Sequence, residues 1–121
     1  MFLNLSNHPS ANWSAEQTEA ATRLYGEVID LPFPAVNPAG DEAYIADLAD
    51  EYCQKVLALA EGKNITVHLM GEMTLTFAIL KRLQAYGIPC VASTTRRETM
   101  EENGVKTSVF KFVKFRNYNV I

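Results

Sequence analysis

The feature that most constrains this chain is the alternation of short apolar runs with longer segments typical of helices. The apolar runs lie at residues 2–6, 27–33, 65–70 and 88–95. The segments between them begin near Ser14, Asp41 and residue 75, and they end at Gly26, Gly62 and Gly87, which fits helix caps. Helical crossovers of this length join parallel strands. We therefore expect a small Rossmann-like α/β domain, with a mostly parallel sheet and helices on both faces.

The end of the chain departs from this alternation. Asn103-Gly104 is typical of a two-residue hairpin turn, and residues 109–115 follow it as a run of aromatic, β-branched and basic residues. This pattern predicts a final strand antiparallel to the fourth. The run is too apolar for an open sheet edge, so we expect one face to pack on the domain and the other to meet solvent or a partner.

The length and the distribution of charge limit the function classes. A chain of 121 residues suits one domain, spanning residues 1–121. Residues 1–95 carry five basic and eleven acidic side chains, a net charge of −6, whereas residues 96–121 carry six and three, a net charge of +3. So small a basic segment favours a local anion over duplex nucleic acid. The alternative is an edge strand protected by lysines.

Several classes of protein are disfavoured by missing motifs. The start of the chain lacks a signal-peptide pattern and no apolar run could span a membrane, so we expect a cytoplasmic protein. Cys53 and Cys90 have neither a disulfide-framework nor a zinc-site spacing, and we expect both to be buried. The chain has no GxGxxG and no GxxxxGK[ST], and only two histidines. We therefore expect no cofactor and no metal site.

Ligands of open parallel sheets bind beyond the carboxyl ends of the strands. Four loops meet there in the expected fold, at residues 6–10, 31–34, 70–74 and 93–97. They bring hydroxyls, an amide, guanidinium groups, an aromatic ring and a helix N-terminus, which together suit the phosphates and base of a nucleotide. The residues we expect to contact this ligand are Asn7, Ser10, Phe33, Gly71, Glu72, Met73, Thr74, Ser93, Thr94, Thr95 and Arg97.

Two residues at this edge are the candidates for catalysis. His8 is a candidate acid or base because imidazole titrates near neutral pH, although a loop-capping role is the alternative. Arg96 is the candidate for stabilising phosphate charge, with Arg97 expected to face the other way. Glu72 would repel a phosphate at its helix N-terminus, so it either binds a sugar hydroxyl or is structural. The other histidine, His68, lies inside a strand, where alternation is expected to point it away from the edge.

Three segments carry a resemblance to a known family: the opening run 2–9 (FLNLSNHP), residues 71–74 (GEMT) and residues 93–96 (STTR). Together they resemble the small stand-alone accessory proteins of type III CRISPR systems, which are similar to the CARF (CRISPR-associated Rossmann) domain. The resemblance implies binding of a cyclic oligoadenylate across a two-fold homodimer. It also implies a ring nuclease that cleaves this messenger without metal, by attack of an adenosine 2′-hydroxyl on its neighbouring phosphate. The positions that match the family are His8, Ser10, Thr94 and Arg96.

Two other function classes remain open from the sequence. One is a nucleotide-sensing or adaptor module of the same fold that does not cleave its ligand. The other is a protein whose role is subunit association through its C-terminal strand. We expect a homodimer, because a single small domain with one exposed pocket edge can enclose a symmetric, ring-shaped ligand only by pairing.

Overall fold

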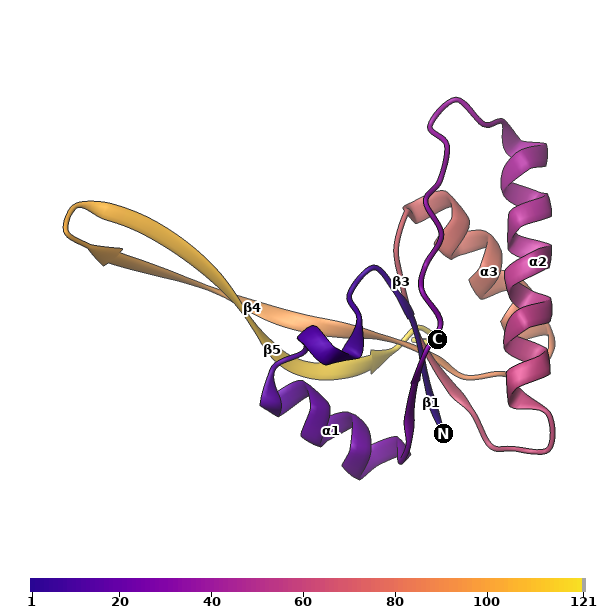
Figure 1. Ribbon diagram of the computed structural model, residues 1–121, viewed down its shortest axis with the longest axis horizontal. Helices are drawn as coiled ribbons and strands as arrows, with labels where there is room; N and C mark the ends of the chain where they lie inside the picture. The colour runs from indigo at the N-terminus through magenta and orange to yellow at the C-terminus, as the bar shows by residue number, and fades with distance from the viewer. Residues whose placement is uncertain (121) are drawn as a thin grey trace.

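Five strands form one sheet in the computed structural model, which describes residues 1–120. They are β1 (Phe2–Ser6), β2 (Val28–Asp30), β3 (Thr66–Met70), β4 (Cys90–Glu102) and β5 (Val105–Asn117). Their order across the sheet is β2-β1-β3-β4-β5, in which the first four strands are parallel and β5 is antiparallel to β4. The expected small Rossmann-like α/β fold is confirmed (Figure 1).

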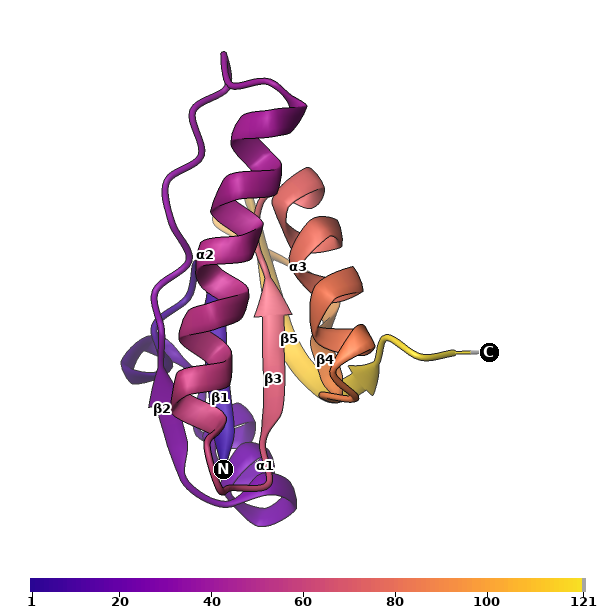
Figure 2. The ribbon, with the colours of Figure 1, turned by 90° about the vertical axis from the view of Figure 1, so that its right-hand side faces the viewer.

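Three helices cover the two faces of this sheet. Helix α1 (Ala15–Tyr25), preceded by a short 3-10 turn (Ser10–Asn12), lies on one face. Helices α2 (Glu42–Ala60) and α3 (Met73–Ala85) lie side by side on the other (Figure 2). The caps of the first two helices are as expected: Ser14 Oγ accepts from the amide of Gln17, and Asp41 Oδ1 accepts from the amide of Tyr44.

Side chains of the parallel strands alternate between two hydrophobic clusters. Leu3 and Leu5 of β1 join the larger cluster, under α2 and α3. Phe2 belongs to the smaller cluster, under α1, where its ring stacks on Tyr25 with a centroid distance of 4.4 Å. The face under α1 is therefore the less apolar one, and polar side chains occupy the rest of it. Cys53 and Cys90 are buried as free thiols, as expected.

Helix α3 is less buried than its apolar composition predicts. Its composition predicts burial on most faces, but only the stripe of Leu75, Ile79 and Leu83 is fully buried. Met73 is 82% exposed and Phe77 63% exposed, because they lie on the side that points away from α2 and the sheet. None of the helices within residues 1–120 is long and apolar enough to cross a membrane.

The hairpin formed by β4 and β5 is longer than its apolar residues predict. The apolar runs predict a fourth strand that ends at Thr95 and a last strand that starts at Val109, whereas the two strands stay paired as far as Glu102 and Val105. The turn itself is as expected, since Asn103 and Gly104 both have positive φ values of 54° and 77°. The outer part of the hairpin, residues 96–111, extends away from the rest of the sheet (Figure 1). We call this segment the arm.

Candidate functional site

A row of polar side chains crosses the sheet on the face covered by α1. Asp30, Asn4 and His68 are register partners on the neighbouring strands β2, β1 and β3. Asn4 Nδ2 donates to Asp30 Oδ1 at 2.8 Å, and Asn4 Oδ1 lies 2.8 Å from His68 Nδ1. On the other side of the imidazole ring, His68 Nε2 lies 3.2 Å from the Ser93 hydroxyl of β4. The row is thus one connected chain of hydrogen bonds over four strands.

The partners of Asn4 fix the tautomer of His68. Asn4 Nδ2 donates to Asp30 and to the His8 carbonyl, and Asn4 Oδ1 accepts from the Ser6 hydroxyl. The amide oxygen therefore faces His68, so the hydrogen lies on Nδ1 of the imidazole. The Nε2 atom of the neutral ring is then an acceptor, and the Ser93 hydroxyl is the donor that faces it.

Burial keeps His68 neutral. Its side chain is 1% exposed, and its ring packs edge-on against Trp13 at a centroid distance of 5.5 Å. Desolvation of the charged form, and after it repulsion from the neighbouring His8, lowers the pKa of His68 to about 4. At neutral pH His68 is consequently an uncharged hydrogen-bonding group.

The other end of the row carries a charge. Burial by itself raises the pKa of Asp30, but hydrogen bonds from Asn4 and Ser10 outweigh burial and hold this pKa below its usual value. The Ser10 hydroxyl donates to Asp30 Oδ2 at 2.8 Å. The loop that follows β1 is thereby tied to β2, which fixes the backbone around His8.

A groove of about 860 Å³ opens above the Ser93 end of this row. The segment that follows β1 and the start of α1 form one wall, the carboxyl end of β3 and the inner part of β4 form the floor, and β5 forms the other wall. It is lined by His8, Asn12, Trp13, Ser14, Glu16, Gln17, His68, Met70, Ser93, Thr95, Val109, Phe110, Lys111 and Phe112. The groove thus lies at the strand edge where ligands of such sheets bind.

Three of the candidate residues lie in this groove: His8, Ser93 and Thr95. His8 is exposed at the rim, and its carbonyl accepts from the side chains of Asn4 and Trp13. The loop conformation at His8 therefore depends on the buried row, while its imidazole remains accessible.

The helix N-terminus expected to hold a phosphate is occupied by the protein itself. The Glu72 carboxylate accepts from the amides of Thr74 and Leu75 at 3.1 and 2.9 Å and from the Thr74 hydroxyl at 2.8 Å. The Leu75 amide, and after it Thr74, lowers the pKa of Glu72. Of the two roles considered for Glu72, this geometry favours the structural one, as the cap of α3. Met73 extends from this helix into solvent.

Phe33 and Gly71 contact each other away from the groove. The Phe33 ring is 8% exposed and covers Gly71 so closely that a Cβ atom there would lie 2.5 Å from the ring. The ring is therefore part of the core and not a free stacking surface. Asn7 lines a separate small hollow of about 130 Å³ beside Phe33 and Asp30.

Arg96 and Arg97 are expected from the sequence just beyond the end of the fourth strand, but they lie within β4, in the arm. Nothing in residues 96–102 breaks a strand, since this stretch contains neither Gly nor Pro. β4 is also separated from β1 by β3, so these arginines and His8 do not follow adjacent strands. Arg97 donates to Ser108 Oγ across the hairpin. Thr94 lies at a register shift, where its hydroxyl bonds the backbone of Lys114.

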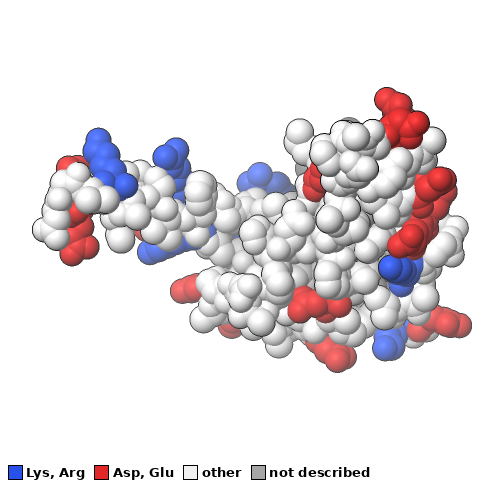
Figure 3. Space-filling model, turned by 45° about the horizontal axis from the view of Figure 1, so that its top comes forward, with Lys and Arg blue, Asp and Glu red and all other residues white. Residues whose placement is uncertain are grey.

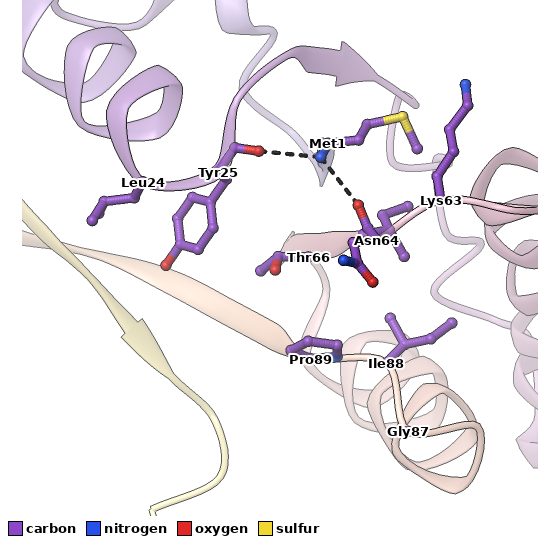
Figure 4. A pocket seen from close by; sticks show the side chains of 10 residues that line it. Met1, Leu24, Tyr25, Lys63, Asn64, Thr66, Gly87, Ile88 and Pro89 are labelled. Atoms are coloured by element: carbon purple, nitrogen blue, oxygen red, sulfur yellow. Dashed lines mark hydrogen bonds between the residues drawn. The ribbon is translucent and has the colours of Figure 1, made fainter.

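A second hollow, of about 530 Å³, lies at the opposite end of the sheet (Figure 4). Its polar groups are largely engaged with the backbone: the Met1 amino group donates to the carbonyls of Tyr25 and Asn64 at 3.1 Å each. Lys63 is its only charged side chain. This hollow is at the amino ends of the parallel strands, so the groove above Ser93 is the better candidate for a ligand site.

Sequence reasoning missed much of the groove. His68 faces α1 and the groove floor, contrary to the expectation that it points away. The pattern that could have found it is alternation: His68 lies between the buried Val67 and Leu69, as Asn4 lies between Leu3 and Leu5. Polar residues at alternate positions of buried strands mark one polar row on one face. Trp13, Lys111 and Phe112 are groove residues that no local pattern indicates.

The fold and the groove define a small Rossmann-like α/β protein with an added hairpin arm. A family model, that of the uncharacterized protein MJ1673 family, matches residues 1–116, and the chain belongs to this family. No curated protein and no solved structure matches the chain.

Proposed function

We propose that the protein binds a cyclic oligoadenylate in the groove and cleaves it as a metal-independent ring nuclease of type III CRISPR signalling, in the cytoplasm. The observation that carries the proposal is the composition of the groove. It combines aromatic rings, hydroxyls, a histidine at the rim and a lysine at the carboxyl edge of a Rossmann-like sheet. The resemblance of residues 2–9, 71–74 and 93–96 to CARF-like accessory proteins supplies the ligand class.

The walls of the groove suit an adenine nucleotide. Trp13, Phe110 and Phe112 offer ring faces or edges on which a base can stack. Lys111 also lines the groove, but the hairpin register puts its side chain on the face opposite Phe110 and Phe112, where its ammonium lies 3.1 Å from Glu98. A phosphate would have to draw the ammonium away from that carboxylate. The Ser93 and Thr95 hydroxyls on the floor can bond phosphate or ribose oxygens.

The proposed cleavage is an internal transesterification. The 2′-oxygen of one ribose bonds to the adjacent phosphorus, the bond from phosphorus to the 5′-oxygen breaks, and a 2′,3′-cyclic phosphate and a free 5′-hydroxyl result. The 2′-hydroxyl proton goes to a base and the leaving 5′-oxygen takes a proton, so no water or metal is consumed. His8 is the accessible imidazole for this proton transfer or for alignment of the 2′-hydroxyl. Arg96, whose role at the phosphate stays a prediction, lies on the arm beside Lys111.

A sensor that binds without cleaving is the second candidate function. His68 is the imidazole fixed most firmly at the groove floor, and its pKa of about 4 makes it a weak proton acceptor at neutral pH. This favours a ligand-positioning role for the polar row. In that case the groove would select and hold the messenger, and the bound state would be the output.

Incubation of the purified protein with radiolabelled cyclic oligoadenylates in EDTA separates these functions. A linear product ending in a cyclic phosphate supports the nuclease, and His8→Ala should then slow single-turnover cleavage by about 10²–10⁴-fold if His8 moves a proton. An intact ligand with retarded mobility supports the sensor. If no ring size in the series gives either a linear product or a retarded ligand, the proposal is overturned and the association protein is favoured.

A further inference from the structure

The arm presents large apolar side chains to solvent on a ribbon of two strands. Met100, Val105 and Phe110 are 54%, 64% and 66% exposed, and no helix within residues 1–120 covers either face of the arm (Figure 1). An isolated two-stranded ribbon is marginally stable in water, and exposed apolar edges tend to pair with other chains. These side chains are therefore expected to be buried by a partner.

One face of the β4–β5 hairpin is covered by α1 near the body of the domain and is uncovered along the arm. Cross-strand partners share a face of the hairpin, and the partners Ser93 and Phe115 lie on the α1 side of the sheet. Successive pairs on that face are Thr95 with Phe112 and Arg97 with Phe110. Exposure rises along this aromatic stripe: Phe115 is 7% exposed, Phe112 is half-buried and Phe110 is 66% exposed. The covered surface thus stops at the N-terminal end of α1, and the stripe continues beyond it.

The charge of the arm complements the rest of the same chain. The arm carries four basic and three acidic side chains, a net charge of +1, whereas residues 1–95 carry a net charge of −6. On the face shown in Figure 3, lysines and arginines lie along the arm, with acidic side chains at its tip, and further acidic side chains lie over the body of the domain. A second copy of this chain therefore supplies both an apolar arm and an acidic body to the first. A nucleic acid fits less well, because Glu98, Glu101 and Glu102 interrupt the basic side chains of the arm.

We propose that the arm of each protomer packs against a second copy of the chain, in a two-fold dimer in which the Phe110 stripe is buried and the basic side chains of the arm meet the acidic body of the partner. In a closed two-fold dimer, both arms are buried against the partner at the same time. Phe110 also lines the groove, so the partner covers the outer end of the ligand site. This inference goes beyond the proposed function, because the dimer forms whether or not a cyclic oligoadenylate binds.

The oligomeric state of the ligand-free full chain tests the proposal, by sedimentation velocity or light scattering at micromolar concentration. The wild-type chain is expected to be a dimer. Phe110→Asp should raise the dimer dissociation constant by at least about 30-fold, because a buried interface aromatic typically contributes 2 kcal/mol or more. The matched control is Phe77→Asp, which changes an equally exposed phenylalanine on α3 and should leave the dimer intact.

A second variant shortens the arm without disturbing the domain. Arg97 and Phe110 are opposite each other, so residues 98–109 can be replaced by Asn-Gly to close a two-residue turn at the same register. The shortened chain should keep the circular dichroism spectrum of the body and be monomeric. A wild-type monomer, a dimer that survives both arm changes, or an arm that shifts an RNA or DNA duplex while the chain is monomeric would each overturn the proposal.

Discussion

Asn4 and His68 are register partners on adjacent parallel strands, and their side chains meet 2.8 Å apart on the face covered by α1. Both are 1% exposed, so the interaction is shielded from water. The same asparagine reaches Asp30 on its other side, which makes it the only link between an ionised carboxylate and a neutral imidazole in this row. The arrangement of His8 and Ser93 at the groove depends on this asparagine.

Replacing Asn4 should therefore destabilise the fold. In Asn4→Leu the buried Nδ1 hydrogen of His68 loses its acceptor, the Ser6 hydroxyl loses the nearer of its two acceptors, and the His8 carbonyl loses the Asn4 donor. Each unsatisfied buried group costs about 1–3 kcal/mol, so we expect a loss of at least about 2 kcal/mol in the free energy of unfolding, measured by urea denaturation. Asn7→Leu, in the exposed loop that follows, is the matched control and should change stability by less than about 0.5 kcal/mol. Equal stability of the two variants would show that the row contributes little.

The stability of the protein should depend on pH through His68. In the folded chain its pKa is about 4, below the ordinary value of 6.5, so between these values the unfolded chain binds more protons. Stability is then fully present above about pH 6.5 and falls as pH decreases toward 4, by up to about 3 kcal/mol. Urea midpoints over this pH range measure the slope. His68→Gln should flatten it, whereas His8→Gln, at the exposed neighbour, should not; a steep slope that persists in His68→Gln would contradict this assignment.

Local signals in the sequence predicted the elements well where a short motif determines the backbone. Ser14 and Asp41 cap their helices, and Asn103-Gly104 forms the turn, because a single side chain or a pair of positive φ values is sufficient at these positions. The length of the hairpin was not predictable in the same way. Residues 96–102 are exposed on both faces or nearly so, and a strand without a buried face has no hydrophobic alternation to reveal it.

The site was predictable only as an edge of the sheet. The carboxyl ends of β1 and β3 do meet there, but which loop side chains enter the groove depends on contacts between distant residues. Glu72 turns back to its own helix, and Phe33 covers Gly71, so neither extends toward a ligand. Lys111 lies opposite Arg96, a pairing that the hairpin register alone determines.

Gly71 should be intolerant of a side chain. A Cβ atom there would lie 2.5 Å from the Phe33 ring, which is buried and cannot move without disturbing the core. Gly71→Ala is expected to lower the free energy of unfolding by about 1–3 kcal/mol, measured by urea or thermal denaturation. Combination with Phe33→Leu, which removes the ring, should recover part of the Gly71→Ala loss; a strictly additive double variant would place the strain elsewhere.

The cap of α3 gives a prediction about Glu72. Glu72→Ala removes the acceptor for the Thr74 and Leu75 amides and should reduce stability by about 0.5–2 kcal/mol. Glu72→Asp, a residue that caps helices well, should retain most of it. If Glu72 instead binds a ribose hydroxyl, Glu72→Ala would weaken cyclic oligoadenylate binding and leave the denaturation curve unchanged, so the two measurements on one preparation separate the roles.

Arg96 and Lys111 offer a matched test of which basic side chain reaches the ligand. They are register partners on the arm and carry the same charge, but only Lys111 lines the groove. A charge-assisted hydrogen bond to phosphate is worth about 1.5–3 kcal/mol, so Lys111→Ala should weaken binding of a cyclic oligoadenylate by at least about tenfold. Arg96→Ala removes an equal charge and should have the smaller effect, if its contribution is long-range attraction alone. Binding is measured by titration at two salt concentrations, because a direct contact survives salt better than long-range attraction does. If Arg96→Ala weakens binding more than Lys111→Ala does, Arg96 is the residue that contacts the phosphate. The ligand then lies along the arm and not above Ser93.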